Sequence, residues 1–246
     1  MKTLALEQTQ KMMAVNGGNL WLRRSKVKSL PKDLRVGGNL DLAYTSIESL
    51  PEGLTVGRNL WLEGSKIKSL PKGLKVGGSL YLENTAIESL PEGLTVGRDL
   101  WLNGSKIKSL PEGLKVRGHL DLAYTPIKSL PADMAVCGSL CLEGSKVKSL
   151  PKDLRVGGNL DLAYTSIESL PEGLTVGRNL WLEGSKIKSL PKGLTVGGDL
   201  CLRRSNVETL PDGITVCGDI YTDGGDVSYY CRRLQSWARS IRLQLG

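Results

Sequence analysis

The sequence predicts a mainly β solenoid of about eleven turns of twenty residues, and two observations lead to this prediction. A Leu or Ile recurs every twenty residues, from Leu20 to Ile220, with no insertion or deletion. Most units also read L-x-L-x-x-(S/T)-x-(I/V)-x-S-L-P-x-(G/D)-L-x-V and continue into a Gly-rich pair. A fixed short period is typical of stacked turns, because each unit buries its apolar face only against its neighbours. Residues 18–228 are therefore expected to form one repeat domain.

Within one turn, residues 59–78, the pattern predicts a strand followed by a return path. Leu60 and Leu62 alternate with other residues, as in a short strand whose leucines face the core. Twenty residues leave no room for a full helix, so the return path is expected to be extended or to contain a 3₁₀ turn. The pair at 77–78 is Gly-Gly, which we expect to bend the chain into the next strand with a positive φ. Four further side chains are expected in the core: Ile67, Leu70, Leu74 and Val76.

The two ends are predicted to be caps, because the apolar faces of terminal turns are otherwise exposed. Residues 1–17 form the predicted N-terminal cap, and the segment 3–14 has a helix-forming composition. Residues 229–246 form the predicted C-terminal helical cap, with apolar residues at an approximately helical spacing. For this basic segment, a helix that binds a membrane surface or a partner is the alternative.

Strand side chains that point away from the core form two columns on a face that is expected to be concave. From the turn of Asp41 to the turn of Trp181, these columns contain seven acidic residues and no Lys or Arg. The acidic residues are Asp41, Glu63, Glu83, Asp121, Glu143, Asp161 and Glu183. Exposed aromatic residues among charges are typical of binding hot spots, although the rings can instead lie flat over small neighbours and cover the sheet. The residues predicted to bind a partner here are Trp61, Glu63, Tyr81, Glu83, Trp101, Asp121, Tyr124, Asp161, Tyr164, Trp181 and Glu183.

The formal net charge of +8 raises nucleic-acid binding as an alternative function. Most of the lysines, however, follow the strands on one flank of the turns, where they alternate with glutamates. One such column reads Lys28, Glu48, Lys68, Glu88 and Lys108. Opposite charges on neighbouring strands favour in-register stacking. Lys108, Lys128 and Lys148 break the alternation, and they are the candidate patch for a nucleic acid or another anionic surface.

The sequence predicts no catalytic, metal or cofactor site. His119 is the only histidine, and no nucleophile recurs beside it. The five cysteines contain no C-x-x-C spacing and no Cys/His cluster, which argues against the usual zinc patterns. Cys141 and Cys201 share a column, but three turns separate them by roughly 14 Å, beyond the reach of a disulfide. Unpaired thiols are typical of a cytosolic protein.

The core L-x-L-x-x-N-x-L of the leucine-rich-repeat family corresponds here to Leu60, Leu62, Ser65 and Ile67. With the L-P pair at 70–71, this unit resembles the short twenty-residue class found in bacterial leucine-rich-repeat effectors. The resemblance implies a parallel sheet on the concave side. Ser or Thr replaces the Asn column of the family, and a hydroxyl there can still bond the backbone of a neighbouring turn, although less fully than an amide. A right-handed parallel β-helix is the competing architecture.

These features predict a non-enzymatic scaffold of bacterial or phage type that binds a partner protein of unknown identity. We expect a monomer without a transmembrane segment, because no apolar run approaches the ~20 residues that a membrane span needs. The expected location is the cytoplasm, or outside the cell after export by a specialised secretion system without a cleaved signal peptide. Some bacterial repeat effectors carry a separate ubiquitin-ligase domain, and the roughly twenty residues after the last turn are too few for one.

Overall fold

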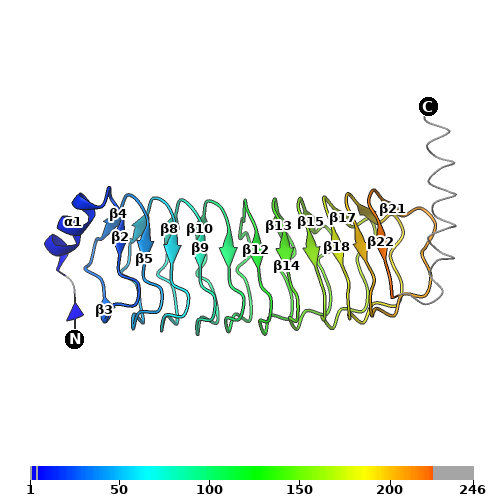
Figure 1. Ribbon diagram of the computed structural model, residues 1–246, viewed down its shortest axis with the longest axis horizontal. Helices are drawn as coiled ribbons and strands as arrows, with labels where there is room; N and C mark the ends of the chain where they lie inside the picture. Colours follow the sequence, from blue (N-terminus) through cyan, green and yellow to red (C-terminus); the bar gives the residue numbers. More distant parts are fainter. Residues whose placement is uncertain (1, 4, 224–246) are drawn as a thin grey trace, which may run out of the picture.

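The computed structural model describes residues 2–3 and 5–223, and these form an elongated stack of turns (Figure 1). Within residues 5–223, one parallel sheet of eleven strands, here called the main sheet, runs along the whole stack. Its strands are β2 (Leu20–Trp21), β5 (Leu40–Asp41), β7 (Leu60–Trp61), β9 (Leu80–Tyr81), β11 (Leu100–Trp101), β12 (Leu120–Asp121), β14 (Leu140–Cys141), β16 (Leu160–Asp161), β18 (Leu180–Trp181), β20 (Leu200–Cys201) and β22 (Ile220–Tyr221). Residues twenty apart pair in register, as Leu100 does with Leu80 and Leu120. The predicted solenoid is therefore confirmed.

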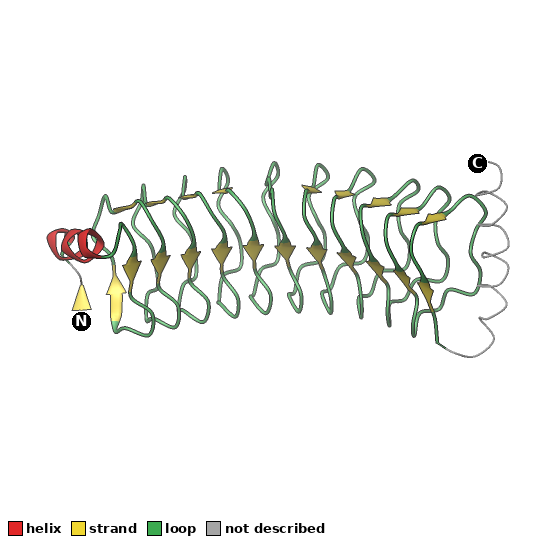
Figure 2. Ribbon diagram, turned by 45° about the horizontal axis from the view of Figure 1, so that its top comes forward, coloured by secondary structure: helices red, strands yellow, loops and turns green. Residues whose placement is uncertain are grey.

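A second set of parallel strands lies on the return path, just before each bend into the main sheet (Figure 2). In the described part of the chain it has two sections, which isolated bridges at Val116 join through Val96 and Val136. Its strands are β4 (Arg35–Val36), β6 (Thr55–Val56), β8 (Lys75–Val76), β10 (Thr95–Val96), β13 (Ala135–Val136), β15 (Arg155–Val156), β17 (Thr175–Val176), β19 (Thr195–Val196) and β21 (Thr215–Val216). Residues 5–223 contain no 3₁₀ turn, so the extended return path is the correct alternative.

The apolar positions of the repeat form one continuous core between the two sets of strands. In the turn of residues 59–78, all six predicted core side chains are buried. These are Leu60, Leu62, Ile67, Leu70, Leu74 and Val76. Burying one such side chain stabilises the fold by about 1.5–3 kcal/mol. Because the same positions recur in every turn, each turn obtains this stabilisation from the turns beside it.

The prediction that the Gly-Gly bend has a positive φ is wrong. Positive φ occurs instead at Gly64, three residues after the end of β7, and at Gly73 on the return path. A Cβ atom at Gly77, in the bend, would stand 2.3 Å from the carbonyl oxygen of Gly57 in the preceding turn. The absence of a side chain at this position lets consecutive turns approach closely.

A column of polar side chains beside the bend joins consecutive turns, and it was not predicted from the sequence. Asn39 Oδ1 accepts a hydrogen bond from the backbone N–H of Asn59, at 3.0 Å, and Asn59 Oδ1 accepts one from Ser79, at 2.8 Å. Further along, Asp99 Oδ1 accepts from the N–H of His119, at 2.8 Å. The side chain before each main strand thus satisfies a backbone donor of the next turn. This set of residues is called the polar column below.

The Ser and Thr column, whose hydroxyls could bond a neighbouring turn, does so nowhere in the described residues. Thr45 Oγ1 donates instead to the carbonyl oxygen of Leu42 in its own turn, at 2.6 Å. The same bond within a turn forms at Thr85, Thr125, Thr165 and Ser205. Hydroxyl oxygens that are buried without a partner belong to Ser25, Ser65, Ser105, Ser145 and Ser185. Hydrogen bonds from side chains to the backbone of the next turn come instead from the polar column.

The N-terminal segment covers the first turn, as expected for a cap. Helix α1 (Leu6–Val15) packs two methionine side chains against the core, and β1 (Lys2–Thr3) pairs with β3 (Val27–Ser29). The predicted C-terminal helical cap, residues 229–246, lies outside the described residues. The domain boundaries given above remain predictions. Within the described part, α1 is the one helix, and it is too short and too polar to cross a bilayer.

Candidate protein-binding face

Side chains of the main sheet that point away from the core form one surface, here called the outer face. Its first column is the second residue of each main strand, and its second column lies two residues later. The predicted site residues that are half-buried on this face are Trp61, Glu63, Tyr81, Glu83, Trp101, Asp121, Asp161, Trp181 and Glu183. Tyr124 and Tyr164 are exposed beside them. The fold therefore places all eleven predicted residues along a single surface, and their binding role remains a prediction.

Four aromatic rings pack along the first column in the N-terminal half of the outer face; Trp61, Tyr81 and Trp101 are stacked, and Trp21 is tilted by 36° against Trp61. Trp61 and Tyr81 have ring centroids 5.4 Å apart and planes inclined by 10°, and Tyr81 and Trp101 are 6.3 Å apart at 2°. Trp21 lies 6.0 Å from Trp61, two turns away, and the intervening Asp41 is only 8% exposed. Each such ring pair contributes about 0.5–1.5 kcal/mol beyond area burial. The rings therefore pack on one another and still present a half-exposed aromatic surface.

Trp181 lies apart from this aromatic stack. Its in-register neighbours are Asp161 on one side and Cys201 on the other. Apart from Asp41, the first column is therefore aromatic in its N-terminal half, whereas between Trp101 and Trp181 it is acidic or thiol-bearing. The order of residues in the first column can be read from the sequence, but the prediction treated Trp61, Trp101 and Trp181 as one group.

The exposed tyrosines lie over glycines of the following turn. A Cβ atom at Gly144 would stand 2.7 Å from Tyr124 Cδ1, and one at Gly184 would stand 2.6 Å from Tyr164 Cδ1. The phenol groups then reach acids of that next turn: Tyr124 donates a hydrogen bond to Glu143, and Tyr164 donates one to Glu183, at 2.8 Å. This hydrogen bond raises the pKa of Tyr124 to about 12. The sequence signal for this packing is a Gly twenty residues after each of Tyr44, Tyr124 and Tyr164.

A group of acids lies between Trp101 and Trp181 on the outer face. Burial raises the pKa of both Asp121 and Asp161, and the charge of Glu143 adds to each shift. Burial also raises the pKa of the Cys141 thiol to about 12, and the three carboxylates around it add to that rise. This part of the face is therefore strongly negative and partly desolvated, which favours a cationic ligand.

Cys141, Glu143 and Asp161 bring one sulfur and two carboxylate oxygens within 4.8 Å of one another. Sequence spacing missed this group because its members come from two turns. Cys141 Sγ lies 4.0 Å from Asp161 Oδ2, where the protonated thiol donates a weak hydrogen bond to the carboxylate. A metal ion at this group would require the thiolate form of Cys141. The described cysteines, Cys137, Cys141, Cys201 and Cys217, are all free thiols.

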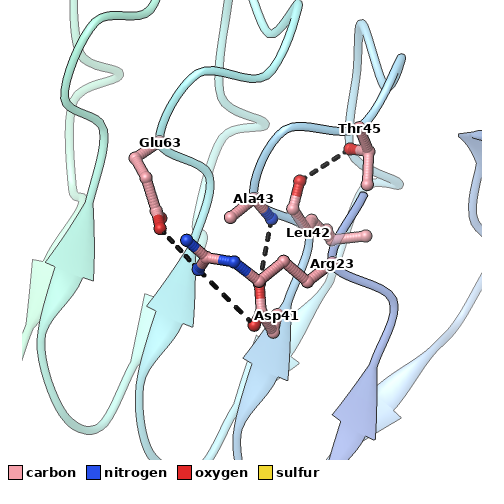
Figure 3. Close-up of polar contacts among 6 residues, drawn as sticks. All are labelled: Arg23, Asp41, Leu42, Ala43, Thr45 and Glu63. Atoms are coloured by element: carbon pink, nitrogen blue, oxygen red, sulfur yellow. Dashed lines mark hydrogen bonds and ion pairs between the residues drawn. The ribbon is translucent and has the colours of Figure 1, made fainter. Parts of the chain in front are cut away.

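Glu63 and Glu83, beside the aromatic stack, differ in their surroundings. Glu63 Oε1 accepts a hydrogen bond from Arg23 Nη1 at 2.8 Å, across two turns (Figure 3). Both residues have a buried Oε2 atom without a hydrogen-bond partner, but Glu83 forms no ion pair within the described residues. Burial raises the pKa of Glu83 to about 7, and the charges of Glu63 and Asp121 contribute to the rise. Glu83 is therefore an unpaired acid beside half-exposed aromatic rings.

The Lys and Glu column forms the predicted ion pair at one position. Lys108 Nζ lies 2.6 Å from Glu88 Oε2, and both side chains are exposed. Lys128 and Lys148 are exposed and form no ion pair within the described residues. A shallow depression on the same flank is lined in part by Lys66, Lys68 and Lys106, with Glu48 beside them. This flank therefore carries basic and acidic side chains side by side, except around Lys128 and Lys148, where the charges are basic.

Comparisons with known proteins give similarity at the level of the backbone. No protein-family model matches the chain, and a search of curated proteins finds no match either. Similar solved structures include YopM, a leucine-rich effector protein from Yersinia pestis, with a TM-score of 0.49 and 14% identity over 81% of this chain and 70% of that chain. Another is the leucine-rich-repeat domain of a Shigella effector, with a TM-score of 0.43 and 17% identity over 89% of this chain and 87% of that chain.

Proposed function

We propose that this chain is a non-enzymatic scaffold whose outer face binds a basic or mixed-charge partner protein. The observation that carries the proposal is the composition of this face between the turns of Asp41 and Trp181, where its two columns contain seven acids and no Lys or Arg. In the same stretch, the half-exposed rings of Trp61, Tyr81 and Trp101 stack in contact.

The physical support is twofold. Rigid, half-exposed aromatic rings lose little conformational entropy on binding, which is why Trp and Tyr are common in binding hot spots. Glu83 and Asp121 lie next to the rings and are partly desolvated, so a cationic side chain has a strong electrostatic reason to approach them.

The size of the face agrees with a protein partner. Trp61 and Trp181 lie six strand intervals apart in the main sheet, which is about 29 Å at ~4.8 Å per interval. A specific protein interface typically buries about 800 Å² on each side. A partner that contacts both tryptophans therefore covers a surface of ordinary interface length.

The test is affinity capture with three substitutions on the outer face, Trp61→Ala, Trp101→Ala and Trp181→Ala, combined in one variant. The matched control changes three exposed residues of the second set of strands: Lys75→Ala, Thr95→Ala and Arg155→Ala. We expect a protein that the parent and the control retain, and that the aromatic variant loses. Circular dichroism must show that both variants stay folded. Retention of the same proteins by all three chains would remove the proposal.

A further inference from the structure

A constellation of three residues occurs three times on the outer face, wherever a turn reads D-L-A-Y-T. It consists of the Asp of the main strand, the Tyr three residues later, and the Glu of the following turn. In each copy, Asp Oδ1 accepts a hydrogen bond from the N–H of the Ala two residues on, at 2.9–3.0 Å. The copies are Asp41, Tyr44 and Glu63; Asp121, Tyr124 and Glu143; and Asp161, Tyr164 and Glu183. The backbone therefore presents the same three side chains in three places.

The first copy holds an arginine of the chain itself. Arg23 Nη1 lies 2.8 Å from Glu63 Oε1 and 3.9 Å from Asp41 Oδ2, so the guanidinium bridges two carboxylates (Figure 3). The Arg23 Cζ atom also stands 5.0 Å from the ring centroid of Tyr44, within the range of a cation–π contact. The first copy is thus an observed binding site for a guanidinium group, formed by two acids and one ring.

The third copy has an arginine nearby. Arg204 Nη1 lies 3.9 Å from Glu183 Oε1, and it approaches from the following turn. The arginine pairs of the array, Arg23 with Arg24 and Arg203 with Arg204, thus stand in turns next to the first and third copies.

The central copy has no such arginine. Asn103 occupies the repeat position of Arg23, and Gly104 occupies that of Arg24. Within the described residues, neither Asp121 nor Glu143 forms an ion pair. Glu143 instead accepts the phenol hydrogen bond of Tyr124, which is 63% exposed.

We infer that the central copy is a receptor for an arginine side chain of a partner, supplied by an exposed or extended segment of that protein. The inference rests on the proposed function and names the group that the outer face recognises. The guanidinium would take the place that Arg23 takes in the first copy, between Asp121 and Glu143 and against the ring of Tyr124. Arginine suits this site better than lysine, because its planar group can bond two carboxylates at once and stack on a ring.

The electrostatics of the central copy agree with this assignment. Burial raises the pKa of Asp121, and the neighbouring Glu143 charge adds to the rise. A bound cation would remove part of that repulsion and would be held by charge-assisted hydrogen bonds. Asn103 is shorter than arginine. The place equivalent to that of the Arg23 guanidinium is therefore open to a guanidinium group of the partner.

The experiment uses a fluorescein-labelled Gly-Arg-Gly-Arg-Gly peptide and fluorescence anisotropy at low salt. The key variant is Asn103→Arg, which should fill the central copy from within the chain, as Arg23 fills the first. We expect it to weaken peptide binding by about tenfold. Thr95→Arg is the matched control, since it adds the same charge at an exposed position of the second set of strands, and it should leave the affinity nearly unchanged. Equal affinities of these two variants would overturn the inference.

Three further measurements guard against a folding defect or a purely long-range charge effect. Glu143→Gln should weaken binding to a similar degree without adding bulk. A peptide with lysine should bind several-fold more weakly, and one with citrulline, which is neutral, should not bind. Arg23→Ala, which vacates the first copy, should increase the amount of peptide bound per chain. Equal binding of the arginine and lysine peptides would contradict a guanidinium-specific site.

The two proposals fail separately. If a captured protein depends on Trp61 and Trp101 but binds Asn103→Arg as well as it binds the parent chain, the scaffold function stands and the arginine receptor is wrong. If the peptide discriminates Asn103→Arg from Thr95→Arg, while no captured protein depends on the tryptophans, the receptor stands and the proposed partner-binding face is wrong.

Discussion

The Nδ1 atom of His119 accepts a hydrogen bond from the backbone N–H of Ser139, at 2.9 Å. This bond gives the lone histidine the place that Asn, Asp or Ser takes in other turns of the polar column. Its partner is a backbone group of the next turn, so the bond joins two turns beside the main sheet. The position favours a structural role for His119 over a catalytic one.

Replacing His119 by Leu is therefore expected to lower the free energy of unfolding by about 1 kcal/mol, because the Ser139 N–H loses its acceptor. The matched variant is His119→Asn, which should retain most of the stability, since Asn39 and Asn59 accept the equivalent bond in their turns. Urea unfolding followed by circular dichroism measures both. Equal stabilities of the Leu and Asn variants would show that the bond contributes nothing.

The stacking of the core predicts a strong dependence on position along the array. Leu100 and Leu20 are both fully buried, but Leu100 lies in the middle and Leu20 in the first main strand. Leu100→Asp buries an unpaired carboxylate between two halves of the stack and should cost about 4 kcal/mol or more. Leu20→Asp should cost less, because local fraying leaves most turn-to-turn contacts intact. Thermal melts measure both variants, and equal losses in Tm would contradict nearest-neighbour stabilisation.

The pKa of Glu83 predicts a pH dependence of stability. Burial raises this pKa from its ordinary value of 4.5 to about 7. Between these values the folded chain binds more protons than the unfolded chain, so the contribution of Glu83 to stability falls as the pH rises from about 4.5 to about 7. Glu83→Gln should therefore be more stable than the parent at pH 8, by at most about 1 kcal/mol because the side chain is partly exposed.

Melting curves from pH 5 to pH 8 test this prediction. The control is Glu88→Gln, because a hydrogen bond from Lys108 lowers the pKa of Glu88, so its contribution is present at high pH and is lost as the pH falls. This control should show no gain in stability at pH 8. A Glu83→Gln variant whose Tm follows the parent across the whole range would contradict the burial of an unpaired charge.

A substitution at Lys128 distinguishes a structural role of the flank from a role in binding. Lys108, Lys128 and Lys148 are like charges in consecutive turns, so Lys128→Glu restores the alternation and should raise the free energy of unfolding by a few tenths of a kcal/mol, as is typical of exposed pairs. Thermal melts at low and high salt measure this gain. A binding assay with heparin or RNA tests the alternative function, in which the same change abolishes binding and phosphate contacts give a steep salt dependence. Anion binding that survives in Lys128→Glu would leave Lys128 without a role in it.

The twenty-residue period was enough to predict the solenoid, the register and the core. In a stack of equal turns, a residue at Leu60 must meet its equivalents at Leu40 and Leu80, because the same position in consecutive strands pairs. The period likewise predicted which side chains share the outer face, since strand residues alternate between core and solvent. It could not give the backbone conformation of the bend, where Gly77 serves close packing and not positive φ.

Contacts between different columns and over more than one turn were decided by the tertiary structure alone. Arg23 reaches past Asp41 to Glu63, and Trp21 reaches across the same turn to Trp61. These two contacts depend on the length and rotamer of each side chain and on the small size of Asp41 and Ala43. The assignment of residues to columns does not specify such contacts. The same holds for the central copy of the constellation, where Asn103 is too short to make the contact that Arg23 makes. The repeat period gives the column in which each residue lies. Contacts that a side chain makes outside its own column are determined only by the packing of the turns in the tertiary structure.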